Sequence, residues 1–187
     1  MKNIIKVLFF LLYFKDSMAI EIRTLAVIND ESISSYDLEK SIKALEEMSQ
    51  KKIEKQKYSL ILDNLISNKI KSIEINKNKI NIDNKIINNQ LYEKYPSINK
   101  AKISKNLKDY LFNDIKINYA WNILLNRKFS NQLAVNTNEI REILKTRNIP
   151  DDKKDDLITI EKNKKLVIIS KIYFNKISSG MYVEKFK

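Results

Sequence analysis

The sequence predicts a mainly α fold: an irregular multi-helix domain with a short N-terminal β-hairpin and a small C-terminal β element. Apolar residues recur at the spacing of an amphipathic helix over most of the chain, whereas short β-branched runs occur toward its two ends. The 187 residues include one glycine and two prolines, so residues that break helices are rare. This length corresponds to one domain, or to one domain with an extension, and is enough to bury a hydrophobic core.

The first 19 residues have the pattern of a cleavable export signal. Lys2 and Lys6 form its basic start, Val7–Phe14 its apolar centre, and Ser17–Ala19 a cleavage site of small residues. The apolar centre is too short for a membrane anchor, because a helix needs about 20 apolar residues to cross a bilayer. We therefore expect an exported protein from which this segment is removed.

A β-hairpin is the first element expected after the signal. Leu25–Ile28 favours a strand, and Asn29 and Asp30 tolerate the tight turn that must follow it. Ser34 and Asp37 then have the spacing of a capping box, which starts a helix. Apolar residues at helical spacing predict the side of this helix that faces the core. They are Leu38, Ile42, Leu45 and Met48.

Three further helices follow by the same periodicity. One spans residues 54–74, and the next is capped by Asp83 and ends before Pro96, since proline disfavours the helical conformation of its predecessor. Residues 97–101 are a predicted loop. The longest helix, at 103–129, carries apolar residues on two sides. Such a helix is either covered by two neighbours or leaves one side available to a partner.

Asn136 and Glu139 repeat the capping pattern and predict a short helix that ends at Pro150. Beyond Pro150, residues 151–156 suggest a charged linker, and the β-branched runs at 157–160 and 166–174 suggest a hairpin or two edge strands. The expected organisation is a signal peptide at 1–19, a helical domain at 20–149, and a linker with a β-rich extension at 150–187.

Composition excludes several kinds of chemistry. The chain has no histidine and no cysteine, which excludes the usual zinc sites, the Ser-His-Asp and Cys-His catalytic pairs, and disulfides. A single glycine is too few for a glycine-rich phosphate loop. The acidic residues of 151–156 have the pattern of a solvated run. We expect no catalytic residues, no metal and no cofactor.

The net charge of +12 is spread along the chain, with lysines interleaved with asparagines and isoleucines as in residues 69–81. This pattern favours a solvated basic surface over nucleic-acid binding. A weak contact with an anionic membrane surface, sensitive to salt, stays open. The sequence does not define the oligomeric state.

Several segments occur in a characteristic order. They are Thr24–Leu38, Leu62–Ile66, Ile75–Leu91, Tyr119–Leu125 and Val135–Ile140. In this order, and behind an export signal, they resemble the N-terminal region of the SurA family of periplasmic chaperones and parvulin-type peptidyl-prolyl isomerases. The likeness covers residues 22–144. It implies a multi-helix chaperone domain in the periplasm.

The chain departs from this family after its helical part. Leu166–Phe174 is similar to the first strand of a parvulin domain, but the chain ends 13 residues later. A parvulin site, as the family implies, uses histidines and a glycine-rich frame that this sequence lacks. Prolyl isomerase activity is therefore not expected. The C-terminal segment that completes the family's chaperone core has no clear counterpart, and we consider residues 181–186 as a pairing strand in its place.

The preferred hypothesis is an ATP-independent holdase that binds unfolded exported polypeptides, outer-membrane protein precursors among them, through an apolar and aromatic groove. At each candidate position a core role is the commoner alternative, most of all at Trp121, while Tyr92 and Tyr95 suit an exposed rim. Two alternatives remain: a membrane-tethered envelope assembly factor, and a non-catalytic truncated remnant of a SurA-type isomerase. The candidate residues are Tyr92, Tyr95, Tyr110, Phe112, Tyr119, Trp121 and Phe129.

Overall fold

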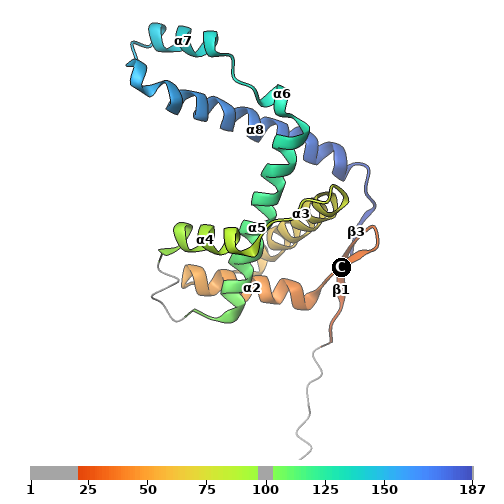
Figure 1. The fold of residues 1–187 in the computed structure, drawn as a ribbon. Coiled ribbons are helices and arrows are strands. Elements are labelled where there is room, and N and C mark those ends of the chain that lie inside the picture. Colours follow the sequence, from red (N-terminus) through yellow and green to blue (C-terminus); the bar gives the residue numbers. More distant parts are fainter. Residues whose placement is uncertain (1–20, 97–102, 187) are drawn as a thin grey trace, which may run out of the picture.

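A computed structural model describes residues 21–96 and 103–186, and its helices and small antiparallel sheet confirm the predicted mainly α fold (Figure 1). The predicted signal at 1–19 and the predicted loop at 97–101 lie outside the described residues. In chain order the elements are β1 (Thr24–Ile28), β2 (Glu31–Ser34), α2 (Ser35–Ser49), η1 (Lys55–Lys57), α3 (Tyr58–Lys77), α4 (Asn84–Lys94), α5 (Lys105–Lys128), α6 (Ser130–Leu133), α7 (Thr137–Thr146), η3 (Asp151–Lys153), α8 (Lys154–Ser178) and β3 (Val183–Lys185).

The sheet joins the two ends of the described chain. Its strand order is β2-β1-β3, and both neighbours run antiparallel to β1. The predicted turn is present, with Asn29 in the left-handed region at φ 51°. Asn29 also holds the C-terminal end of the described chain. Its N–H donates to the carbonyl of Tyr182 at 2.9 Å, and its Oδ1 accepts from the Tyr182 N–H at 3.0 Å. Residues 181–186 thus contain a pairing strand.

Helix starts follow the side chains that the sequence singled out. The Asp37 N–H donates to Ser34 Oγ at 3.2 Å, and the Ser34 N–H donates to Asp37 Oδ2 at 2.9 Å, which completes the capping box. Asp83 and Asn136 each accept from the backbone N–H two residues further on, at 2.8 and 3.0 Å. Ser104, which the sequence analysis did not single out, caps α5 by accepting from the Leu107 N–H, three residues further on, at 3.0 Å. Each cap satisfies a backbone donor that the helix leaves unpaired and stabilises it by about 1 kcal/mol.

Helix α5 is the centre of the molecule (Figure 1). Helices α2, α3 and α4 contact it, and α8 crosses its C-terminal half, so both of its apolar sides are covered by neighbours. The predicted inner side of α2 is partly wrong: Ala44 is buried, whereas Met48, in the last turn of the helix, is exposed. None of the described helices is both long enough and apolar enough to cross a membrane.

The largest difference from the sequence prediction is α8. Residues 154–178 form one helix of 25 residues, so the strands predicted at 157–160 and 166–174 are wrong, and residues 154–156 open the helix instead of ending a linker. Tertiary packing explains the difference, because a helical stripe of this segment packs against α3, α5 and the sheet, with Tyr173 buried and the other residues half-buried, and this burial outweighs β propensity. The residues of this stripe are Leu166, Ile169, Tyr173, Phe174 and Ile177.

Candidate binding groove

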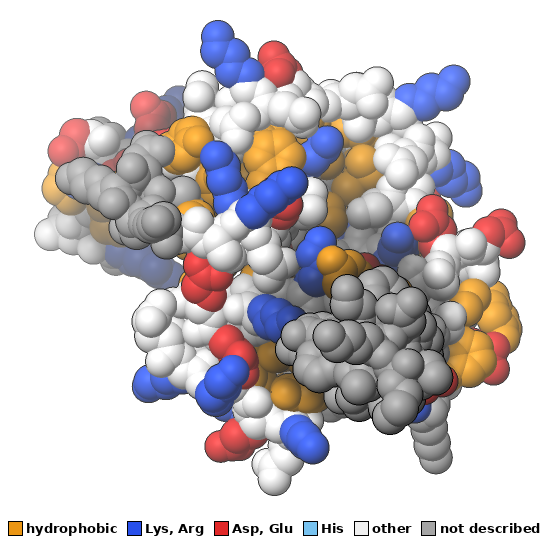
Figure 2. Space-filling model, turned by 90° about the horizontal axis from the view of Figure 1, so that it is seen from below, with side chains coloured by type: hydrophobic (Ala, Val, Ile, Leu, Met, Phe, Trp, Pro, Cys, Tyr) orange, Lys and Arg blue, Asp and Glu red, His pale blue; other side chains and the backbone are white. Residues whose placement is uncertain are grey.

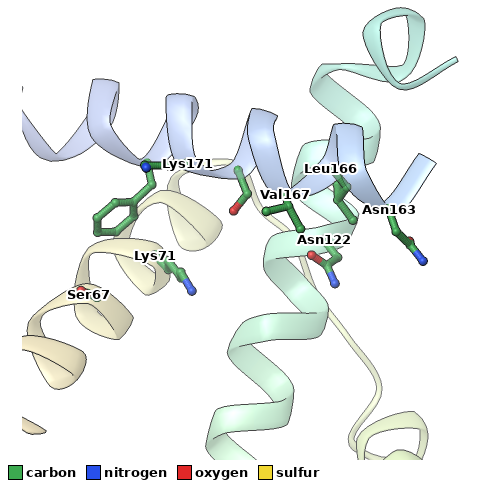
Figure 3. Close-up of a pocket in the computed structure, with 9 residues that line it drawn as sticks. Ser67, Lys71, Asn122, Asn163, Leu166, Val167 and Lys171 are labelled. Carbon is green, nitrogen blue, oxygen red and sulfur yellow. The ribbon is translucent and has the colours of Figure 1, made fainter. Parts of the chain in front are cut away.

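A groove of about 500 Å³ lies where α8 passes over α3 and α5 (Figure 3). Leu166 and Val167 descend into it from α8, Lys71 reaches into it from α3, and Asn122 faces it from α5. The other residues that line it are Ser67, Asn163, Ser170, Lys171 and Phe174.

The outer side of α8 carries a second set of apolar residues, which the core does not cover. Ile160, Val167, Ile168 and Ile172 have the spacing of one helix face and form what we call the α8 stripe. Val167 is 69% exposed and Ile172 is 64% exposed. Val167 also lines the groove, so the α8 stripe and the groove form one continuous surface. Contiguous exposed apolar area of this kind is typical of interaction sites.

A buried polar cluster joins the inner side of α8 to α3 and α5. Glu74 on α3 is only 5% exposed. Its carboxylate accepts hydrogen bonds from the Tyr173 hydroxyl, from Asn78 Nδ2 at 2.7 Å and from Lys128 Nζ at 3.2 Å. Lys128 Nζ also donates to the Tyr173 hydroxyl at 2.7 Å. The cluster ties α3, α5 and α8 together, and all three hydrogen bonds are accepted by one carboxylate oxygen, Glu74 Oε1.

Electrostatics keep this cluster charged at neutral pH. Burial by itself raises the pKa of Glu74, but the hydrogen bonds from Tyr173, Asn78 and Lys128 outweigh it and hold that pKa below its ordinary value. The hydrogen bond with Tyr173, together with the contact to Glu74, raises the pKa of Lys128 above its ordinary value. Burial and the hydrogen bond to Glu74 raise the pKa of Tyr173. These shifts strengthen an ion pair and are typical of a structural link.

Aromatic rings surround the same cluster. The Trp121 ring stacks on Tyr173 with centroids 5.6 Å apart, and Phe129 meets Tyr173 edge-on at 5.2 Å. The Trp121 indole N–H donates to Ser170 Oγ at 2.8 Å. Since Ser170 lines the groove, this bond connects the groove wall directly to the core. The α8 side of the groove is therefore held by packing and by hydrogen bonds.

Six of the seven aromatic residues predicted as a binding surface pack in two core clusters, and Tyr92 lies outside both. Trp121 is 2% exposed, and it lies with Phe129 around Tyr173. Tyr92 is half-buried on α4, where its hydroxyl accepts from Lys108 Nζ at 3.3 Å. The seven do not line one common groove. Those that pack half-buried against the cluster between α4 and the first half of α5 are Tyr95, Tyr110, Phe112 and Tyr119.

Sequence reasoning missed the residues of α8 that form the groove and the α8 stripe. The signal was present, because the apolar residues from Leu166 to Ile177 recur at intervals of three and four. The basic side chains are distributed as predicted: on the face shown in Figure 2, lysines and arginines are spread over the surface with acidic and exposed apolar side chains between them. Within the described ranges, no group of acidic side chains has the arrangement of a metal site.

No protein-family model matches this chain, and no curated protein is significantly similar to it. The groove is therefore interpreted from its own geometry.

Proposed function

We propose that the protein is a periplasmic, ATP-independent holdase of the SurA type, which binds unfolded exported polypeptides, including precursors of outer-membrane proteins. The observation that carries this proposal is the α8 stripe, which leaves four large apolar side chains exposed beside a groove on a highly charged molecule. Surfaces of this kind take up apolar segments by area and shape without reading an exact sequence.

The proposed mechanism is burial. A client strand places apolar side chains over Val167, Ile168 and Ile172 and inserts one into the groove against Leu166 and Phe174. Each square ångström of apolar surface removed from water contributes about 25 cal/mol. A holdase competes with aggregation by mass action, so modest affinity with rapid release is sufficient.

This proposal moves client contact from the predicted aromatic residues to α8. Trp121 and Tyr173 become positioning residues. They hold α8 in the position that leaves its outer side exposed to solvent. Tyr92 and Tyr95, half-buried beside the end of α4, stay as a second rim whose contribution is separable by mutation.

The direct test is suppression of aggregation. We expect the purified protein to keep an unfolded outer-membrane barrel protein soluble near equimolar ratio, and we expect the double variant Val167→Ser with Ile172→Ser to lose most of this protection. Leu60→Ser is the matched control, because Leu60 is 62% exposed but lies on α3 outside the groove. Protection no better than that of serum albumin, or full protection by the double variant, contradicts the proposal.

Membrane binding is the competing outcome of the same experiment. An apolar stripe that alternates with lysines is also the pattern of a helix lying on an anionic bilayer. The result that favours this alternative has two parts. The wild type floats with vesicles that contain phosphatidylglycerol and the double variant does not, while neither protein reduces aggregation of the client. The α8 stripe then serves a membrane-tethered assembly factor instead.

A further inference from the structure

The side chains that line the groove beside α8 carry positive charge only. Two of its lining residues, Lys71 and Lys171, are cationic, and its other polar lining residues are neutral. No carboxylate is among the described residues that line it. The hollow beside Tyr110 differs, because Asp37, Asp109 and Asp114 line it. The groove is thus lined by two cationic side chains and, among the described residues, by no anionic one.

Lys71 is a half-buried cation that forms no ion pair with a described residue. Within the described part of the chain, its Nζ donates only to the neutral amide oxygen of Asn118, at 3.5 Å. Lys69, on the same helix, pairs with Glu31 at 3.1 Å, whereas Lys71 forms no ion pair with any described residue. Burial lowers the pKa of Lys71, and the more distant Asp114 offsets this only in part.

A partly desolvated ammonium that forms no ion pair with a described carboxylate is poised to accept an anion. A charged hydrogen bond to a carboxylate replaces the lost water and is about twice as strong as a bond between neutral groups. Lys171 adds a second positive charge at the same groove, and Leu166, Val167 and Phe174 provide the apolar surface next to these charges. The site therefore combines two recognition elements, a cation and an apolar wall, within one groove.

We propose that the groove selects client segments in which an aspartate or glutamate side chain is flanked by apolar residues, with the carboxylate bound at Lys71, and with Lys171 adding a second positive charge to the same groove. This inference rests on the proposed holdase function and deepens it. The positive net charge assists by drawing acidic segments toward the surface before they dock.

Three fluorescent peptides test this selectivity. They share the same apolar residues and differ only at a central position, which is Glu, Gln or Lys. For the wild type, we expect the Glu peptide to bind about fivefold more tightly than the Gln peptide, and the Lys peptide to bind most weakly. Fluorescence anisotropy measures each Kd. At about 1 M salt, where the screening length is about 3 Å, we expect the preference to weaken but to persist, because a half-buried contact is screened less than an exposed one.

Lys71→Gln should remove the preference for the Glu peptide, and Lys71→Arg should retain it. Lys116→Gln is the matched control: Lys116 also donates to a neutral amide, that of Asn84 at 3.3 Å, but it lies outside the groove, and this variant should keep the preference. Thermal unfolding verifies that each variant is folded.

Equal binding of the Glu and Gln peptides to the wild type, or an unchanged preference in Lys71→Gln, overturns the selectivity. If the three peptides bind equally and the Val167→Ser, Ile172→Ser variant loses them all, the holdase proposal still stands. If no peptide binds and the aggregation test also fails, both proposals are overturned.

Discussion

The two sides of α8 have similar apolar composition but different surroundings. On the inner side, Tyr173 is buried between two aromatic rings and bonded to Glu74 and Lys128. On the outer side, Ile168 and Ile172 are exposed to solvent. One helix therefore carries both a structural side and an open side, and the difference indicates that mutations on the two sides will affect different properties. The following predictions test that separation.

Tyr173→Ala should have the largest effect on stability. It removes a ring that stacks on Trp121 and leaves Glu74 without one of its donors, so we expect a loss of about 3 to 5 kcal/mol in the free energy of unfolding. Urea denaturation followed by tryptophan fluorescence measures this loss. Tyr173→Phe keeps the ring and should lose about 1 to 2 kcal/mol. Wild-type stability of Tyr173→Ala contradicts the structural role of the inner side.

Acid should destabilise the protein through Glu74. Because the pKa of Glu74 is lower in the folded state than its ordinary value of 4.5, the ionised group stabilises the fold above that value. This contribution is lost as the pH falls below 4.5 and through the folded pKa.

Glu74→Gln isolates this effect. We expect it to lower the free energy of unfolding by about 1 to 3 kcal/mol at pH 7 and to reduce the dependence of stability on pH in the acid range. Urea denaturation at a series of pH values makes the comparison. An equally steep loss of stability in the variant on acidification assigns the effect to other carboxylates.

Ser170→Ala should have a smaller effect. It removes the acceptor of the Trp121 indole N–H at the border between the core and the groove, and a loss of about 1 kcal/mol is expected. The fluorescence of the single tryptophan should change as its hydrogen bond is lost. An unchanged spectrum together with unchanged stability indicates that this bond does not hold the groove wall.

Ile168→Lys should have the smallest effect on stability, because the Ile168 side chain is 58% exposed. The free energy of unfolding should change by less than about 0.5 kcal/mol, whereas suppression of client aggregation should fall severalfold. Denaturation and light scattering on the same sample separate the two quantities. A loss of stability comparable to that of Tyr173→Ala removes the distinction between the sides.

Local signals predicted much of the fold. The hairpin at Asn29, the caps at Ser34, Asp83 and Asn136, and the long central helix depend on interactions within a few residues of each other, and the structure confirms them. The prediction of strands at 157–160 and 166–174 was wrong because the many β-branched residues of this segment favour strands locally. Its apolar residues at helical spacing stabilise a helix only when α3 and α5 are present to cover them.

The candidate site was harder to predict for a related reason. The sequence identifies which residues are aromatic, but whether a ring is buried or exposed depends on distant partners. The Tyr173 hydroxyl bonds to Glu74, 99 positions away in the sequence, and Trp121 bonds to Ser170, 49 positions away. Pairings over such separations follow from the packing of whole helices and leave no local pattern.

Site-directed photocrosslinking tests the central claim most directly. A benzoylphenylalanine in place of Ile172 should form an adduct with an unfolded outer-membrane protein, and the same group in place of Leu60 should form little. Both positions are similarly exposed, at 64% and 62%, so access to solvent does not distinguish them. Strong crosslinking from the α8 stripe supports client binding there. Equal crosslinking from both positions, or none from position 172, contradicts it.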